Sequence, residues 1–275
     1  MDYEQEVALW RTKAEANLRA ENGWLAVSGL YWLHEGSNTF GTDDSNDAIL
    51  PPGSAAPFAG EILLQGDIAR VRLGPATVGV INGTTAVGTT PIVLATDETH
   101  SPDRLTMAAL SMSIIKRGAR FGIRLWDNKS EARRSFAGRK WFPVNPAYCV
   151  KARFNPYEAP KTLTIITMIG DLEPADSPGT VTFVLEGKTY TLEAESADAS
   201  KGLFFNFKDA TNGHETYGSG RFLTTSGVLD GCVTIDFNKA VSPPCDFTPF
   251  ATCPLPRMEN VLAVRIPVGE LASHH

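Results

Sequence analysis

The chain has 275 residues, 43% of them hydrophobic and 20% charged, which is the composition of a folded globular protein with a sizeable core. Its formal net charge is -6 with lysine and arginine scattered, so the sequence lacks the basic footprint of a nucleic-acid-binding protein. Residues 1–6 are acidic, unlike a secretory signal, and no apolar run approaches the length of a membrane span. We therefore expect a cytoplasmic protein that binds neither nucleic acid nor membrane.

Four cysteines are too few for a disulfide scaffold in a chain of this length. No paired C-x-x-C pattern that would indicate zinc occurs anywhere. The sequence therefore predicts neither a metal site nor a cofactor. His274 and His275 look like the start of a purification tag and are not expected to belong to a site.

The first element is an amphipathic helix over residues 1–23. Its apolar positions share helical spacing and are Tyr3, Val7, Trp10, Ala14 and Leu18. Gly23 stands where a left-handed residue would end the helix.

The next part, residues 24–129, reads as a β-sandwich. Residues 24–33 are dense in aromatic and large apolar side chains and read as one or two buried strands. Short apolar segments then alternate with turn formers such as Asn82-Gly83, which is typical of all-β sandwiches.

A second antiparallel sheet region is predicted over residues 130–275, beginning with an irregular connector over 130–150. Its expected strands are 163–169, 180–185, 189–193, 203–207, 232–238 and 261–266. The Glu186-Gly187-Lys188 break between two alternating runs indicates a hairpin. For the whole chain we predict an all-β, mainly antiparallel fold with one N-terminal helix.

The terminal loop, residues 243–256, is rich in proline and contains Cys245, Phe247, Phe250 and Cys253. It is too apolar for a solvated linker and too rich in proline for a helix, so we expect it to pack against the protein body. The two cysteines in the loop are either buried structural thiols or a loop-closing disulfide under oxidising conditions.

Several sequence segments resemble the family known as domain of unknown function 1684 (DUF1684). They are Arg153-Phe154-Asn155-Pro156-Tyr157, Gly220-Arg221-Phe222-Leu223, residues 24–33, 203–213 and 232–256. The resemblance covers nearly the whole chain but implies no activity, cofactor or catalytic residue. Phe250 stands where the family has a tyrosine, which removes one hydroxyl from the loop.

Residues 24–129 also resemble a forkhead-associated sandwich in the spacing of residues 38–42 and 81–84. Modules of that type recognise phosphothreonine through an arginine that follows the early glycine. Here Thr42 occupies that position. Because a guanidinium group grips phosphate in bidentate fashion, we expect the fold without phosphopeptide binding.

Strand parity over residues 232–238 places Asp236 and Asn238 on one face, towards the terminal loop. We expect Arg221, Asp236 and Asn238 to line one cleft roofed by Phe247 and Phe250. In a simpler alternative, Asp236 and Asn238 only cap backbone N–H groups of the loop.

Two further residues are expected at this cleft: Tyr157 as a ligand contact and Arg153, which could reach it from the neighbouring sheet. Tyr217 would lie at the margin. The competing expectation for the arginines is an ion pair with Asp209 or Asp236 that ties the sheets together.

The leading functional hypothesis is the binding of a small anionic or polar metabolite in this cleft under the terminal loop. The alternative is a metal-independent hydrolase or isomerase that uses Asp236 with Tyr217 or Cys245 as catalytic groups. A third possibility is a protein interaction module that uses the first sandwich.

Overall fold

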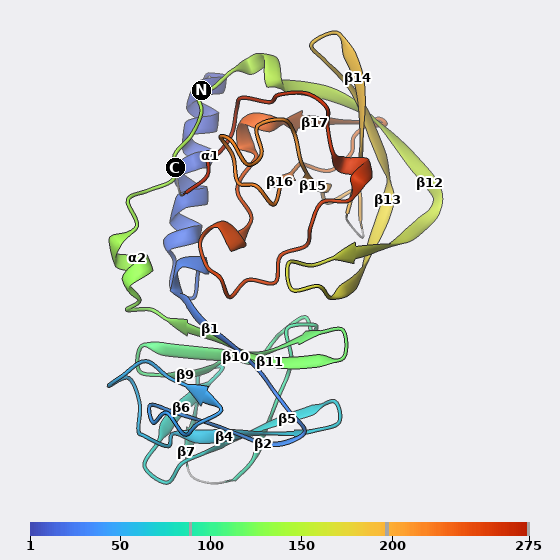
Figure 1. Cartoon of the computed structure of the whole chain (residues 1–275). Coiled ribbons are helices and arrows are strands. Elements are labelled where there is room, and N and C mark those ends of the chain that lie inside the picture. Colours follow the sequence, from blue (N-terminus) through green and yellow to red (C-terminus); the bar gives the residue numbers. More distant parts are fainter. Residues whose placement is uncertain (88–89, 196–197, 274–275) are drawn as a thin grey trace. The chain divides into compact units, whose positions relative to one another are not determined.

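The computed structural model describes residues 1–87, 90–195 and 198–273 and divides the chain into two compact units (Figure 1). The sandwich unit is Leu18–Phe136. The terminal unit combines Met1–Asn17 with Ala137–His275. This division differs from the expected one, because most of the N-terminal helix groups with the end of the chain and does not form a separate part.

The sandwich unit contains two β-sheets among its described residues. The first has the order β1-β11-β10-β9-β6-β7, and the second has the order β3-β2-β4-β5-β8. Neighbouring strands are antiparallel except for the pair β2 and β3. The strands are β1 (Val27–Trp32), β2 (Gly36–Gly41), β3 (Ala48–Ile49), β4 (Gly60–Gln65), β5 (Ile68–Leu73), β6 (Val78–Ile81), β7 (Thr84–Val87), β8 (Ile92–Leu94), β9 (Leu105–Met107), β10 (Leu110–Arg117) and β11 (Arg120–Asp127).

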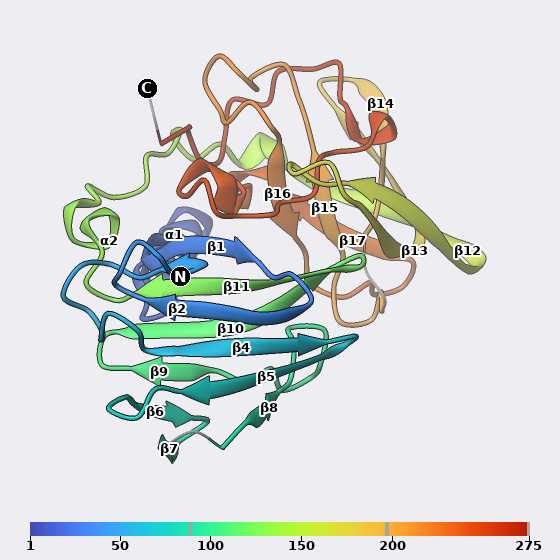
Figure 2. The ribbon, with the colours of Figure 1, turned by 60° about the horizontal axis from the view of Figure 1, so that its bottom comes forward.

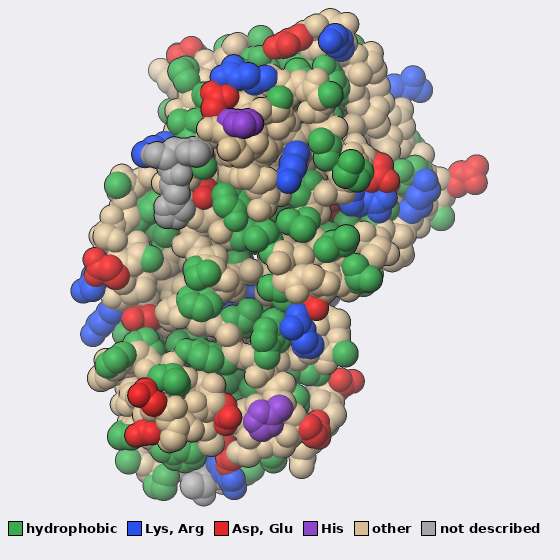
Figure 3. All heavy atoms as spheres, viewed as in Figure 1, with side chains coloured by type: hydrophobic (Ala, Val, Ile, Leu, Met, Phe, Trp, Pro, Cys, Tyr) green, Lys and Arg blue, Asp and Glu red, His purple; other side chains and the backbone are tan. Residues whose placement is uncertain are grey.

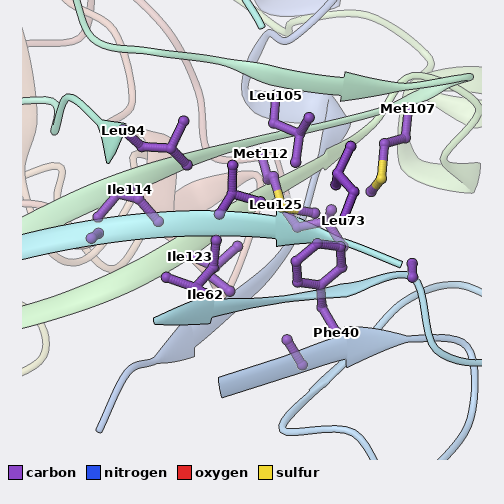
Figure 4. Close-up of a cluster of buried hydrophobic side chains, with 14 of the residues drawn as sticks. Phe40, Ile62, Leu73, Leu94, Leu105, Met107, Met112, Ile114, Ile123 and Leu125 are labelled. Atoms are coloured by element: carbon purple, nitrogen blue, oxygen red, sulfur yellow. The ribbon is translucent and has the colours of Figure 1, made fainter. Parts of the chain in front are cut away.

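One hydrophobic core holds the two sheets of the sandwich unit together. Alternate residues of each strand point inward, so Phe40 and Ile62 of one sheet meet Met112 and Leu125 of the other (Figure 4). All four side chains are at most 1% exposed. Burial of this apolar surface is the main stabilising contribution to the unit.

Helix α1 (Tyr3–Arg19) ends four residues before the predicted boundary. The left-handed residue that follows it is Asn22, with φ 57°, while Gly23 has φ -73°. Asparagine adopts this conformation more readily than most residues, so the turn does not require the glycine. A second short helix, α2 (Glu131–Ser135), lies in the expected irregular connector.

The terminal unit is built on a mainly antiparallel sheet with the order β14-β13-β12-β17 (Figure 1). Its strands are β12 (Cys149–Ile166), β13 (Leu172–Leu185), β14 (Lys188–Glu193) and β17 (Cys232–Asp236), and a separate pair consists of β15 (Phe204–Phe207) and β16 (Arg221–Thr224). The predicted hairpin is confirmed, because Leu185 pairs with Lys188 across Glu186 and Gly187, both with positive φ.

Two predicted strands of this unit need correction. Residues 261–266 form no strand, and only an isolated bridge joins Lys208 to Val261. Strand β17 stops at Asp236, and a 3₁₀ turn follows over Phe237–Lys239. In both places side-chain contacts with distant segments replace the regular ladder, as described below. The all-β fold class is nevertheless confirmed.

Hydrogen bonds from the first turn of helix α1 hold the helix against the rest of the terminal unit. The Tyr3 hydroxyl donates to Asp236 Oδ1 at 2.7 Å and accepts from Asn238 Nδ2 at 2.9 Å. Further along, Arg11 donates to the Phe142 carbonyl at 3.1 Å. These contacts join the two ends of the chain, which explains why residues 1–17 belong to the terminal unit.

The surface carries mixed charges on the face shown in Figure 3, where basic and acidic side chains are interspersed over the terminal unit. Among the described residues, no helix combines the length and apolar character that a membrane crossing requires. Figure 2, turned by 60° so that the bottom of Figure 1 comes forward, shows the strands of the sandwich unit.

Replacement of Tyr3 by Phe should lower the free energy of unfolding by about 1–3 kcal/mol, because Asp236 and Asn238 lose a hydrogen-bond partner in a buried setting. Tyr190→Phe is the matched control, since the Tyr190 hydroxyl has no hydrogen bond within the described chain. Urea unfolding of both variants measures the difference. Equal stabilities would show that the Tyr3 contact contributes nothing.

Candidate functional site

Arg221 forms a buried ion pair at the centre of the terminal unit. The residue is 1% exposed, and its Nη1 atom donates to Asp209 Oδ2 at 2.8 Å and to the Ile266 carbonyl at 3.1 Å. Its Nη2 atom donates to the Val268 carbonyl. The guanidinium therefore pairs with Asp209, and the expected cleft that Arg221 shares with Asp236 and Asn238 stays a prediction. The alternative expectation of a structural ion pair holds for this arginine.

Asp236 and Asn238 do lie together, as expected, but in a second cluster. Asn238 Nδ2 donates to Asp236 Oδ1 at 3.2 Å, and the backbone N–H of Asn238 donates to the same oxygen at 3.1 Å. Lys239 Nζ lies 3.1 Å from Asp236 Oδ2. With Tyr3 on the other side, these polar groups already have partners, and the backbone N–H that Asp236 caps is that of Asn238.

The terminal loop brings two predicted residues into contact. The Tyr217 hydroxyl donates to the Cys245 carbonyl at 3.2 Å, and burial raises the pKa of Tyr217 to about 12. The Phe247 ring lies against the Arg139 guanidinium at 5.0 Å, and the Phe250 backbone N–H donates to Thr248 Oγ1 at 3.3 Å. The loop therefore packs against the protein body.

Tyr157 lies in a cluster with two glutamates that the sequence did not single out. Its hydroxyl donates to Glu193 Oε1 at 2.7 Å, and burial raises the pKa of Tyr157 to about 12. Burial also raises the pKa of Glu195 to about 7, although Arg257 acts in the opposite direction. Glu195 Oε1 is buried without a hydrogen-bond partner among the described residues.

Arg153 is exposed on the outer face of the β14-β13-β12-β17 sheet, the face opposite the core. In β12, Val150 and Ala152 pack into the core while Lys151 and Arg153 are exposed. Within the described chain neither cation has an ion pair or a side-chain hydrogen bond. Two cations without partners thus lie on one face, about 7 Å apart along the strand.

These cations line a hollow of about 570 Å³ on the outer face. The other outward side chains around it include Thr182, Val184 and Thr189. Asn155 Nδ2 donates to Thr182 Oγ1 at 2.9 Å, so the hydroxyl proton of Thr182 is available to a ligand. We call this hollow the outer-face hollow.

A second hollow of about 510 Å³ adjoins the first, because both are lined by Lys151 and Cys232. Its remaining wall comes largely from the turn before β17, including Leu229 and Asp230. Among the described residues, no group of three or more His, Cys, Asp or Glu side chains could hold a metal ion. The polar groups of the hollow suit hydrogen bonding and charge pairing.

Residues 134–271, just over half of the chain, match the family described as "Protein of unknown function (DUF1684)". The chain belongs to this family. A solution NMR structure of an uncharacterised protein from Haloarcula marismortui is 31% identical in sequence, covers 52% of this chain and 80% of that one, and has a TM-score of 0.44. No curated protein matches the chain.

The DUF1684 match includes β12, β17 and the terminal loop, and therefore every residue of the clusters described above except Tyr3. It does not extend to residues 24–33, which the sequence resemblance had included. Sequence reasoning identified Arg153 and Tyr157 but missed Lys151, Glu193 and Glu195. The alternation of Val150, Lys151, Ala152 and Arg153 was the available signal for Lys151.

Replacement of Arg221 by Met should lower the free energy of unfolding by about 3–5 kcal/mol, because Asp209 keeps a buried charge without its partner. The matched control is Arg265→Met, which breaks an exposed pair with Glu215 and should cost less than about 1 kcal/mol. Urea unfolding distinguishes them. Similar losses in both variants would contradict a special role for the buried pair.

Glu195 should make stability depend on pH. Its folded pKa of about 7 exceeds the ordinary 4.5, so the folded state binds the proton more tightly. Its stabilising contribution is complete below pH 4.5 and is lost as the pH rises to about 7.

After solvent screening is included, this loss should be about 1–3 kcal/mol in the native chain and absent in Glu195→Gln. Urea unfolding from acid to neutral pH measures it, with Glu158→Gln, an exposed change, as control. Parallel pH profiles for the native chain and Glu195→Gln would refute the assignment.

Proposed function

We propose that the terminal unit binds a small anionic metabolite in the outer-face hollow. The observation that carries this proposal is the pair of exposed cations, Lys151 and Arg153, which have no protein partner in the described part of the chain. A guanidinium fork binds carboxylate or phosphate in bidentate geometry, and an ammonium group adds a second charge.

The rest of the lining supports a ligand with a charged end and an apolar part. Hydroxyls of Thr182 and Thr189 supply donors for an oxyanion, and Val184 supplies apolar contact. The volume of about 570 Å³ is in the range of small-molecule sites. Since the cations are exposed, binding should weaken as salt concentration rises.

The outer-face hollow supports this function better than the expected cleft beneath the terminal loop. There, Arg221 is held by Asp209, and Asp246 is bonded to Ser273 through the Ser273 backbone N–H at 3.1 Å and its hydroxyl at 2.9 Å. A ligand in that place would have to displace protein partners. At Lys151 and Arg153 it would displace only water.

The hydrolase or isomerase alternative needs Asp236 beside Tyr217 or Cys245. Asp236 contacts Tyr3, Asn238 and Lys239, whereas Tyr217 contacts the Cys245 backbone. The candidate catalytic groups thus have different partners, and binding is the function we favour.

The likeness of residues 24–129 to forkhead-associated modules, and with it a role in protein interaction, stays a prediction from the sequence. The layers of the sandwich unit agree with a two-sheet fold, and Thr42 at the phosphate-gripping position argues against phosphothreonine recognition. The cytoplasmic location is likewise a prediction.

Titration of the full chain with inorganic phosphate and with succinate, followed by amide NMR, tests the proposal. We expect at least one anion to shift the signals of residues 150–153, 182–184 and 189. The double variant Lys151→Ala/Arg153→Ala should lose these shifts, since both charges are gone. Mass spectrometry of molecules released from the purified chain would then identify the natural ligand.

Lys188→Ala is the matched control, because Lys188 is an exposed cation on the same sheet that does not line either hollow. It should keep the shifts of the native chain. Shifts that persist in the double variant, or that centre on another part of the chain, would overturn the proposed site.

A further inference from the structure

Two cysteines, Cys245 and Cys253, come together at the two ends of the terminal loop. Cys245 lies in a 3₁₀ turn over Pro244–Asp246, and its backbone N–H donates to Cys253 Sγ at 3.3 Å. Both residues carry thiols in this structure. A sulfur that contacts the backbone of the other cysteine lies close to the other side chain as well.

The two thiols differ in exposure and in acidity. Cys253 is 5% exposed, while Cys245 is only partly buried. A hydrogen bond with the Cys253 thiol lowers the pKa of the Cys245 thiol, as does the Tyr217 hydroxyl, although burial acts in the opposite direction. Cys245 therefore has the properties of an attacking thiol, and Cys253 those of a resolving thiol.

Both ends of the loop are held in place independently of the thiols. The Met168 N–H donates to the Cys253 carbonyl at 2.8 Å. On the other side, Ser273 Oγ donates to the Asp246 carbonyl and side chain, each at 2.9 Å. The backbone thus keeps the two cysteines adjacent, which favours a bond between them.

We propose that Cys245 and Cys253 form a redox-modification site that a small-molecule disulfide of the glutathione type converts reversibly into an intramolecular disulfide. Entry is at Cys245, and Cys253 completes the bond. The modification closes the proline-rich loop covalently. It is independent of the outer-face hollow and of the function proposed for it.

The exchange proceeds in two balanced steps. The Cys245 thiolate attacks one sulfur of the small disulfide, which forms a mixed disulfide and releases one small thiolate. Cys253 then loses its proton to solvent and attacks Cys245 Sγ, which forms the intramolecular bond and releases the second small thiolate. The two protein thiols are oxidised, and one small disulfide is reduced to two thiols.

The other two cysteines of the chain supply an internal control. Cys149 pairs with Asp236 and Cys232 with Arg153 in the β12–β17 ladder, so the two cysteines are four register positions, about 13 Å, apart. That separation is too large for a disulfide. Burial also raises the pKa of Cys149, which makes its thiol less reactive.

The test is incubation of the full chain with excess glutathione disulfide, followed by alkylation and peptide mass spectrometry. We expect the number of alkylated cysteines to fall from four to two, with a linked pair of peptides that contain Cys245 and Cys253. A reducing thiol should restore all four. Retention of four alkylated cysteines, or a linkage that involves Cys149 or Cys232, would overturn the proposal.

Two single variants test the order of attack. Cys253→Ser should stop at a stable glutathione adduct on Cys245, whereas Cys245→Ser should form little adduct on the buried Cys253. Circular dichroism verifies that each variant is folded, and if one is not, the native chain alone decides. A stable adduct on Cys245 in the native chain, or preferential adduct formation on Cys253, would contradict the proposed roles.

Discussion

The buried ion pair between Arg221 and Asp209 is the constraint on which the terminal unit depends. Asp209 Oδ1 accepts from the Thr211 N–H at 2.8 Å, while its other oxygen meets Arg221 at 2.8 Å. The guanidinium also donates hydrogen bonds to two backbone carbonyls of the terminal segment, those of Ile266 and Val268. Loss of a partner of a buried charge is costly, so this network favours one path of the chain around it. It explains how residues 261–273 can be ordered without regular strands.

A second polar cluster, around Asp236 and Asn238, also fixes the path of the chain in this unit. Tyr3 reaches Asp236 and Asn238 across more than two hundred residues of sequence and connects the first turn of α1 to the end of β17. Asn238 continues the chain of contacts, since its side chain accepts from the Asn145 N–H and donates to the Asn145 carbonyl, each at 2.9 Å. Long-range polar contacts of this kind replace a ladder where β17 ends.

The sequence predicts strands and turns well, because they follow local patterns of residues. It does not predict which distant residue a buried charged side chain pairs with. Alternation and turn residues predicted the hairpin at Glu186 and Gly187, and the all-β class followed from the same signals. The pairing of Arg221 could not be read from the sequence, because Asp209 and Asp236 are both nearby carboxylates and no periodicity distinguishes them. The alternation of apolar residues over 261–266 suggested a strand, because a local pattern does not reveal which distant segment the backbone will contact. The inward side chains of this segment are buried, but its Ile266 carbonyl accepts a hydrogen bond from Arg221 and the segment does not pair as a regular strand.

The contrast between paired and unpaired cations decides where a ligand can bind. To bind an anion, Arg221 would have to leave Asp209 and two carbonyls in an interior that water does not reach, and each loss of a partner carries the full desolvation cost. Arg153 would give up only water and side-chain freedom, about 1.5–2 kcal/mol for a long side chain. An arginine in a sequence segment that resembles the family is therefore not by itself a ligand-binding group. Its burial and its existing partners determine whether its charge stabilises the fold or is available to a ligand.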